Sequence, residues 1–440
     1  MHKHFRPSAI ILAMSSLFAH HAIAQSSVTI YGTMDLSLDS IHKSQGNVQG
    51  TVFGLSGVTP VPNSVASPAQ TMTRIGTSLT GQSHFGLKGV EDLGGGWLAK
   101  FQLESAIVPD TGGLGSDGRL FGRMAWVGVT TPLGELRMGR QAAPMLAGYY
   151  LNSLERLGTT DLIGAGVIVN NLQIYQDNML SYTARSGGWV GQASYSPNAG
   201  VASRVSAARA SATTSTPVAT PTTGQIVGGA TAGSESDTNR GRTYGALGAY
   251  LGHNWKLIGA YHSNDFNAPV GLATTAGGFV PLFSINSYHA YMLGATYNFE
   301  SSGTQLAVNH HDGQYKDSSG ANPKVSTWSM AVKQTLGQFD LIGQVAHGEF
   351  TNFTQGKDVT LMFGADYNLS RRTAIYVRAG QLKDSRGSIV RAALTPVGLA
   401  GGPSVLLVPL GAVEIPLFSG AGASMDATTR LVGVGIRHSF

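Results

Sequence analysis

The chain has no cysteine and few charged residues. Only 12% of its 440 residues are Asp, Glu, Lys or Arg, about half the usual share. Without cysteine, disulfide scaffolds, thiol catalysis and thiolate metal sites are excluded. Long apolar runs are also missing, so the low charge indicates neither a helical membrane protein nor charge-rich disorder.

What the chain has in abundance is glycine, at 59 residues. The formal net charge is +5, and two of the positive charges, Lys3 and Arg6, lie in the N-terminal segment described next. The remaining charge is slight and dispersed along the chain, so the sequence does not predict a nucleic-acid partner. No cofactor and no metal site is expected, because the histidines show no recurring ligand spacing.

The first 24 residues have the pattern of a secretory signal. Lys3 and Arg6 form a positive start, residues 9–19 are mostly apolar, and residues 22–24 (AIA) fit a signal-peptidase cleavage site. The apolar part is too short for a stable transmembrane helix. We therefore expect residues 1–24 to be a signal peptide, and residues 25–440 to form one exported domain.

After this segment the chain consists of short stretches in which apolar and polar residues alternate, as they do in β-strands. Roughly sixteen such stretches follow one another, an even number typical of transmembrane barrels. We expect strands at 28–38, 82–92, 97–105, 120–130, 135–141, 178–184, 189–196, 243–251, 255–262, 288–299, 304–311, 325–335, 339–348, 358–369, 373–383 and 430–440.

The last predicted strand ends on an aromatic residue. Val432, Val434, Ile436 and Phe440 share one face with His438, and the other face carries Gly433, Gly435, Arg437 and Ser439. A free apolar sheet edge invites aggregation, whereas a barrel that pairs its last strand with its first has no free edge. The pattern predicts an all-β, antiparallel transmembrane barrel of the bacterial outer membrane, with lipid around it and a polar interior.

Short turns and long loops alternate between the predicted strands. The long connections are residues 39–81, 142–177, 197–242, 264–287 and 384–428, and such lengths are uncommon in compact soluble domains. Residues 201–238 are rich in Ala, Ser, Thr and Gly and are expected to form a surface loop. Residues 392–423 are apolar but contain four prolines, which excludes a spanning helix.

Four stretches resemble the general porins of proteobacterial outer membranes, which are trimeric, sixteen-stranded diffusion channels. They are Ser27–Asp35, Ser83–Glu104, Leu120–Gln141 and Val432–Phe440. The resemblance implies a homotrimer, short periplasmic turns, long extracellular loops, and passive diffusion of ions and small hydrophilic solutes. It also implies that the third extracellular loop, here Ala142–Asp177, folds into the channel.

In this family the acids of the third loop face a ladder of basic side chains on the wall, and the field between them sets charge selectivity. By motif, Arg123 lies where the family has a wall arginine, and Met124 and Trp126 would then point outward. His84 and Ser181 stand where the family commonly has basic residues. Two positions of the ladder are therefore weakened, and the sign of selectivity stays open.

Strand alternation adds further candidates for the constriction. A charge that faces lipid at mid-membrane costs about 2–4 kcal/mol, so charged strand residues should face inward. The expected inward residues are Lys88, Lys100, Glu104, Arg123, Arg378 and Arg437. The candidate acids of the third loop are Glu155, Asp161 and Asp177, and Arg140 either anchors that loop or lines the wall.

Three other functions remain open at this stage. A barrel enzyme needs a nucleophile, a base and an orienting group held together, but the chain has no G-x-S-x-G or H-E-x-x-H motif. A substrate-selective channel or an adhesin would use the long outer loops. A soluble, secreted, two-domain β protein would be extracted without detergent.

Overall fold

The computed structural model describes the following residues of the chain. They are residues 27–48, 50–54, 57–60, 65–116, 118–164, 174–199, 205–210, 241–273, 279–318, 320, 322, 324–351, 357–385, 391–394, 405–409 and 427–440. The expected signal segment, residues 1–24, lies outside them. In this part of the chain no helix is long and apolar enough to cross a membrane.

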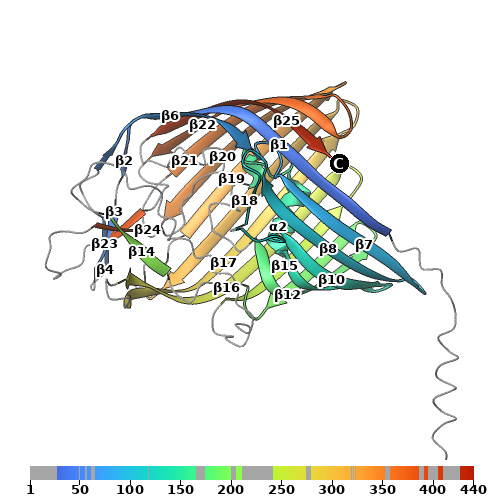
Figure 1. Cartoon of the computed structure of the whole chain (residues 1–440), viewed down its shortest axis with the longest axis horizontal. Coiled ribbons are helices and arrows are strands. Elements are labelled where there is room, and N and C mark those ends of the chain that lie inside the picture. Colours follow the sequence, from blue (N-terminus) through green and yellow to red (C-terminus); the bar gives the residue numbers. More distant parts are fainter. Residues whose placement is uncertain are drawn as a thin grey trace, which may run out of the picture.

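Sixteen of the described strands form one closed antiparallel ring, seen from the side in Figure 1. The predicted all-β barrel is therefore confirmed. The strands of the ring are β1 (Ser27–Lys43), β7 (His84–Gly94), β8 (Trp97–Val108), β10 (Met124–Thr131), β11 (Gly134–Ala142), β12 (Tyr175–Ser186), β13 (Trp189–Ser196), β15 (Arg242–Leu251), β16 (Trp255–Ala273), β17 (Phe279–Phe299), β18 (Thr304–Asp317), β19 (Lys324–Leu336), β20 (Phe339–Thr351), β21 (Lys357–Asn368), β22 (Thr373–Ser385) and β25 (Thr428–Ser439).

The ring closes between its first and last strands, as the C-terminal pattern predicted. β1 and β25 pair without a register shift from Thr33 opposite Ser439 to Lys43 opposite Thr429. The apolar face of β25 points outward, where Val432 is 59% exposed, while Arg437 points inward. Pairing of these two ends leaves no free strand edge.

The outer surface of the barrel is apolar around its circumference, with exposed Val, Leu, Ile and Met side chains on the ring strands. Four of the five tryptophans face outward from strands or their ends, as expected for interface girdles. They are Trp97, Trp189, Trp255 and Trp328.

The fifth tryptophan corrects one prediction. Trp126 was expected to point outward, but it is only 7% exposed, and its neighbour Val127 is 62% exposed on the lipid-facing side. Trp126 pairs with the inward-facing Gln102, and the guanidinium of Arg137 lies 4.1 Å from its ring centre. The error arose because Arg123 precedes β10, which begins at Met124, so strand alternation does not reach it.

The strands extend further than predicted at the end with long loops. β1 continues to Lys43, β6 (Gln70–Thr77) pairs with its last residues, and β16 and β17 form a hairpin that reaches Ala273 and Phe279. Alternating hydrophobicity marks only the part of a strand that contacts lipid. Beyond that part the strands remain paired by backbone hydrogen bonds, but their side chains no longer form an apolar face.

Short strands from several long loops gather at the same end (Figure 1). β14 pairs with β16 and β24, β23 pairs with β24 and β3, and β3 pairs with β4. Apart from β16, these strands fall within the loops predicted at 39–81, 197–242 and 384–428. They are β2 (Gly46–Val48), β3 (Gly50–Gly54), β4 (Gly57–Pro60), β5 (Val65–Ser67), β14 (Val205–Ala210), β23 (Arg391–Leu394) and β24 (Val405–Pro409), and β9 (Gly113–Leu114) lies elsewhere, after β8.

Candidate pore constriction

Next to β1, the ring contains two strands in place of one, β7 and β6, with a connection between them inside the barrel. β1 pairs with β7 over its first residues and with β6 over its last ones, and residues 78–83 connect the two. Ser78 has a φ of 61°, in the left-handed region that non-glycine residues rarely adopt. The carboxylate of Asp35 accepts hydrogen bonds from Thr80 N (2.9 Å), Thr80 Oγ1 (2.6 Å) and Gly81 N (2.8 Å). Asp35 is 0% exposed, so these bonds hold the connection inside the barrel.

Two wall arginines meet this connection. Arg437 of β25 donates from Nη1 to Thr80 Oγ1 at 2.7 Å. Arg123, which precedes β10, donates from Nη1 to the side-chain oxygen of Gln82. These arginines are more than 300 positions apart in the sequence, and the closure of the barrel brings them to the same short segment.

A third arginine reaches the connection from the loop that follows β11. The side chain of Arg156 lies over Gly81, with its Cβ 3.3 Å from where a Cβ on that glycine would stand. It is exposed and donates to Ser439 Oγ at 3.0 Å. Nothing in the sequence marked Arg156, because a single loop arginine is usually solvated and isolated.

Arg123 joins the wall to the inward loop. It is 6% exposed, and its Nε pairs with Glu104 of β8. Glu104 is 5% exposed and also accepts a hydrogen bond from Tyr31 OH at 2.7 Å. On the other side, Arg123 Nη2 donates to Tyr150 OH at 3.2 Å. The buried ion pair neutralises both charges, so Arg123 acts mainly as a support for the constriction.

Lys88 and His84 lie beside this pair on β7. Lys88 is exposed, and its Nζ lies 5.0 Å from the ring centre of Tyr31. His84 Nδ1 lies 2.7 Å from the carbonyl oxygen of Gln82, and because a carbonyl only accepts, that nitrogen carries a proton. Lys88 presents a positive charge to the lumen that forms no ion pair within the described residues, whereas one ring nitrogen of His84 is hydrogen-bonded to the backbone.

The loop after β11 folds into the barrel, as the resemblance implied. It begins with helix α2 (Pro144–Asn152) and contains a short 3-10 turn, η2 (Leu162–Gly164). Proline in the first turn suits a helix start, since the N–H it lacks would have no partner there. The helix packs against β15, β16 and β17.

An apolar seam holds this helix to the wall. Met145, Leu146 and Tyr149 are each at most 3% exposed. They pack against inward side chains of the barrel, which are Val190, Leu247, Ala249, Ile258, Ala260, Tyr288, Ala290, Met292, Ala307 and Ala331. The part of the inner wall that contacts the helix is therefore largely apolar, although a polar interior was expected throughout.

A glycine and two lysines also contribute to the contact between the helix and the wall. A Cβ on Gly148 would lie 3.1 Å from Met292 Sδ, so glycine lets the helix approach the wall more closely than a larger residue would without shifts of its neighbours. Two wall lysines hold the end of the helix: Lys256 Nζ donates to Leu151 O at 3.2 Å, and Lys333 Nζ to Leu154 O at 3.3 Å. Cations at a helix C-terminus stabilise its free carbonyls and its dipole.

The acids of the inward loop do not face open water. Glu155 has a side chain 4% exposed and pairs with Arg378 of β22, and it accepts a hydrogen bond from Gln344 Nε2 at 2.7 Å. Burial raises the pKa of Glu155 to about 7, although Arg378 acts in the opposite direction. Arg378 also pairs with Asp366 at 2.6 Å, and Asp366 pairs with Arg437 at 3.1 Å. Glu155 is thus tied into a chain of alternating charges.

Asp161 forms its hydrogen bonds within the loop. Its carboxylate accepts hydrogen bonds from Ser153 Oγ, Leu157 N (3.1 Å) and Ile163 N (3.0 Å), and it is 1% exposed. Of these two candidate acids, Glu155 contacts the basic wall residue Arg378, whereas Asp161 binds within the loop. Over its described residues the loop presents Arg156 to solvent, while Glu155 and Asp161 are buried.

Arg140 and Asp177 lie at the two ends of the loop. Arg140 Nη1 contacts Asp177 Oδ1 at 2.5 Å, and Asp177 also pairs with Arg119 at 2.9 Å. The pair joins the end of β11 to the start of β12 and so clamps the loop where it enters and leaves the wall. Ser181, which stands where the family commonly has a basic residue, is buried and donates a hydrogen bond to Gln141 Oε1 at 2.7 Å. Lys100 Nζ forms an ion pair with Glu135 Oε2 at 2.8 Å.

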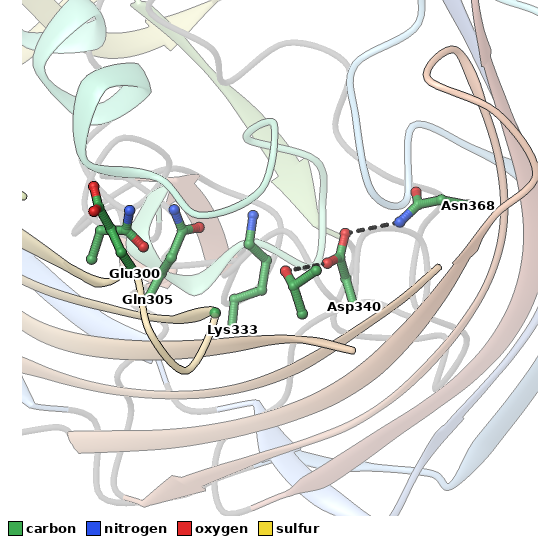
Figure 2. A pocket seen from close by; sticks show the side chains of 8 residues that line it. Glu300, Gln305, Lys333, Asp340 and Asn368 are labelled. Atoms are coloured by element: carbon green, nitrogen blue, oxygen red, sulfur yellow. Dashed lines mark hydrogen bonds between the residues drawn. The ribbon is translucent and has the colours of Figure 1, made fainter. Parts of the chain in front are cut away.

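A hollow of about 480 Å³ lies on the wall near the short-turn end, where Figure 2 shows Lys333 and Asp340 side by side. Asp340 accepts hydrogen bonds from Thr335 (2.6 Å) and Asn368 (3.1 Å). Glu300 lines the same hollow. This region carries charges of both signs, so it adds no strong field of its own. Among the described residues no cluster of three His, Asp or Glu is placed to hold a metal ion.

A sequence profile described as Gram-negative porin matches residues 9–387. The chain belongs to this family. Porins are outer-membrane channels and not enzymes, so this porin is an outer-membrane β-barrel whose strands cross the bilayer. The family assignment made from the four sequence stretches is confirmed.

Relatives and solved structures agree with this assignment. Outer membrane porin protein 32 of Delftia acidovorans is 26% identical over 452 residues, which cover 98% of this chain and 99% of the relative. An outer membrane porin protein of Bordetella pertussis is 32% identical over 185 residues, or 41% of this chain and 45% of the relative. The anion-selective porin from Comamonas acidovorans has the same fold, with a TM-score of 0.61, 21% identity, and coverage of 94% of this chain and 100% of that one.

Proposed function

We propose that this porin forms a water-filled channel for passive diffusion of ions and small hydrophilic solutes, with a mild preference for anions. One observation carries the preference: among the described residues of the constriction, the exposed charges are the cations Lys88 and Arg156, whereas Glu104, Glu155 and Asp35 are buried. Buried carboxylates that are paired or hydrogen-bonded contribute little field to the water beside them. Exposed cations in a narrow passage attract anions.

Two features keep the preference mild. Arg123, Arg378 and Arg437 are each paired with a carboxylate, so most of the arginine charge is compensated. The name of the Comamonas acidovorans protein describes anion selectivity in a channel of the same fold, which supports this sign. We further propose that residues 1–24 are removed on export and that the barrel works as a homotrimer.

The test is a reversal-potential measurement. Purified protein in a planar bilayer should give ohmic conductance steps, and in a tenfold KCl gradient the reversal potential should have the sign of chloride preference. A potential with the sign of potassium preference would overturn the anion proposal while leaving the channel intact. Folded protein that gives no conductance would overturn both proposals. Chemical cross-linking in detergent tests the trimer separately.

A further inference from the structure

The hollow near the short-turn end of the inner wall lies next to the inward loop. Its volume is about 480 Å³, a size that suits a small organic ligand. Lys333 Nζ lines it and donates to Leu154 O of the loop at 3.3 Å. A solute that has passed the constriction therefore meets this exit hollow next. Figure 2 shows five of its residues, Glu300, Gln305, Lys333, Asp340 and Asn368.

Strand pairing places the polar lining of the exit hollow in one row. Asn298 of β17 is the register partner of Gln305 of β18, and Gln305 is the register partner of Lys333 of β19. Asp340 of β20 lies opposite Thr335, two residues after Lys333. Residues at such diagonal positions of an antiparallel pair are about 7–8 Å apart. Lys333 and Asp340 therefore face the same space from adjacent strands (Figure 2).

Lys333 and Asp340 carry opposite charges, but they form no ion pair with each other or with any other described residue. Lys333 gives one hydrogen bond to Leu154 O. The two carboxylate oxygens of Asp340 accept one hydrogen bond each, from Thr335 Oγ1 at 2.6 Å and from Asn368 Nδ2 at 3.1 Å. An ammonium has three donors and a carboxylate about four acceptor positions. The neutral partners thus orient both groups, and donors and acceptors remain for a ligand.

The charged groups beside this pair are bonded directly to a partner. Asp366, the register partner of Asp340, forms an ion pair with Arg378 at 2.6 Å. Glu300 Oε1 lies 2.8 Å from His253 Nε2. The wall around the exit hollow therefore satisfies its carboxylates with its own side chains. The lysine and the aspartate of the hollow are held apart instead, with space between them.

We propose that the exit hollow binds an α-amino acid, with the ligand carboxylate at Lys333 and the ligand ammonium at Asp340. A zwitterion forms a charge-assisted hydrogen bond of about 2.8 Å at each end, whereas an ion of one sign satisfies only one of the two groups. The amides of Asn298 and Gln305 continue the row beyond the lysine and offer donors and acceptors to a polar side chain, such as that of glutamine. The inference rests on the proposed channel function, because the ligand enters the hollow through the lumen.

The test measures the affinity of L-glutamine for the folded, full-length porin in detergent by saturation-transfer NMR. Two analogues separate the ends of the ligand: N-acetyl-L-glutamine lacks the ammonium, and L-glutaminamide lacks the carboxylate. The variants are Lys333→Met and Asp340→Asn. Arg185→Met is the matched control, because Arg185 of β12 is an exposed cation opposite the inward Val190 and lies outside the hollow. Conductance of the same samples in planar bilayers is recorded separately.

We expect each hollow variant to bind L-glutamine about tenfold more weakly or worse, since each loses a hydrogen bond between charged groups, and the control to bind it like the wild type. The analogues should cross over: Asp340→Asn leaves the affinity for N-acetyl-L-glutamine unchanged, and Lys333→Met leaves that for L-glutaminamide unchanged.

Three results would overturn the inference. The first is wild-type porin that conducts ions but binds no L-glutamine, which leaves the channel proposal intact. The second is an equal loss of affinity in the Arg185 control, since the general charge of the lumen would then explain binding. The third is unchanged affinity in Asp340→Asn, which decides the matter even if Lys333→Met disturbs the loop, because Asp340 does not contact Leu154. Binding by folded protein that does not conduct would instead overturn the channel proposal alone.

Discussion

The two halves of the inner wall have opposite character. From β15 to β19 the wall that contacts α2 is largely apolar, with Met145, Leu146 and Tyr149 buried against it. Across the lumen, from β22 through β25 and β1 to β10, the wall carries paired and unpaired charges. Both halves have the same strand geometry and the same apolar exterior. The difference arises because one half serves as a docking surface for a loop, and the other faces water.

This contrast explains how a wide barrel becomes a narrow channel. Burial of apolar surface stabilises at about 25 cal/mol per Å², so the seam can hold the loop inside the lumen without help from its charges. Hydrogen bonds then fix its far end: Thr160 N and Oγ1 donate to Leu79 O at 3.0 and 2.7 Å. The loop crosses from the apolar half to the charged half, where Arg156 lies near Gly81 and Ser439.

The largest effect should come from breaking the apolar seam with Met145→Asp. A buried, unpaired carboxylate costs on the order of 3 kcal/mol or more, enough to raise the undocked population of the loop about a hundredfold. We expect a larger and noisier single-channel current, with weaker ion selectivity. Met145→Leu is the control, because a volume-conserving change is tolerated. An unchanged current in the aspartate variant would mean that the seam does not hold the loop.

The next effect concerns the Arg123–Glu104 pair on the charged half. Arg123→Gln leaves a buried carboxylate and should shift permeability toward cations, whereas Glu104→Gln should shift it toward anions. One charge about 6 Å from the ion path in water corresponds to about 0.7 kcal/mol, or roughly threefold in the permeability ratio. Reversal potentials measure both shifts. The double variant should return close to wild type, and shifts of the same sign in both single variants would contradict the pair.

The sequence predicted the charged half better than the apolar half. Strand alternation and the aromatic C-terminus were sufficient for the barrel and its closure, because a lipid-facing surface imposes a period of two on every strand. The resemblance to the porin family predicted that Arg123 lies on the inner wall. In contrast, the inward apolar residues of β15, such as Leu247 and Ala249, alternate with glycine, alanine and tyrosine on the outer face. Both faces of such a strand are apolar enough that no pattern distinguishes a docking surface from a pore wall.

The loop residues were harder to predict for a related reason. Glu155, Asp161 and Arg156 lie close together in the sequence, and nothing in their composition says which of them reaches solvent. Burial of Glu155 depends on Arg378 and Gln344, which come from strands about 190 to 220 residues away. Likewise, the role of Asp35 depends on the break between β6 and β7. Tertiary contacts decide these roles, and local sequence does not contain them.

A smaller effect is expected from the exposed cations of the constriction. Lys88→Met and Arg156→Met should each reduce the preference for anions by up to about threefold at low salt. The reduction should shrink near 1 M salt, where screening acts within about 3 Å. Lys324→Met, on the outer surface, is the matched control and should leave the reversal potential unchanged. A salt-independent loss in the Lys88 variant would indicate a steric cause and count against a field effect.

The smallest effect, a dependence on pH, would come from Glu155 at the junction of the two halves. Its pKa of about 7, raised from 4.5 by burial, means that the docked loop binds a proton more tightly than the undocked loop. Docking should therefore weaken as pH rises from about 4.5 to 7 and then stay constant. As pH falls through 7, Glu155 loses its charge, Arg378 is less compensated, and the anion preference should rise by less than about twofold. Reversal potentials between pH 8 and 5 should show this step in the wild type and in His84→Asn, but not in Glu155→Gln. If His84→Asn removed the step instead, the wall histidine would be the titrating group. The pH response would then belong to the charged half alone and not to the loop that joins the two.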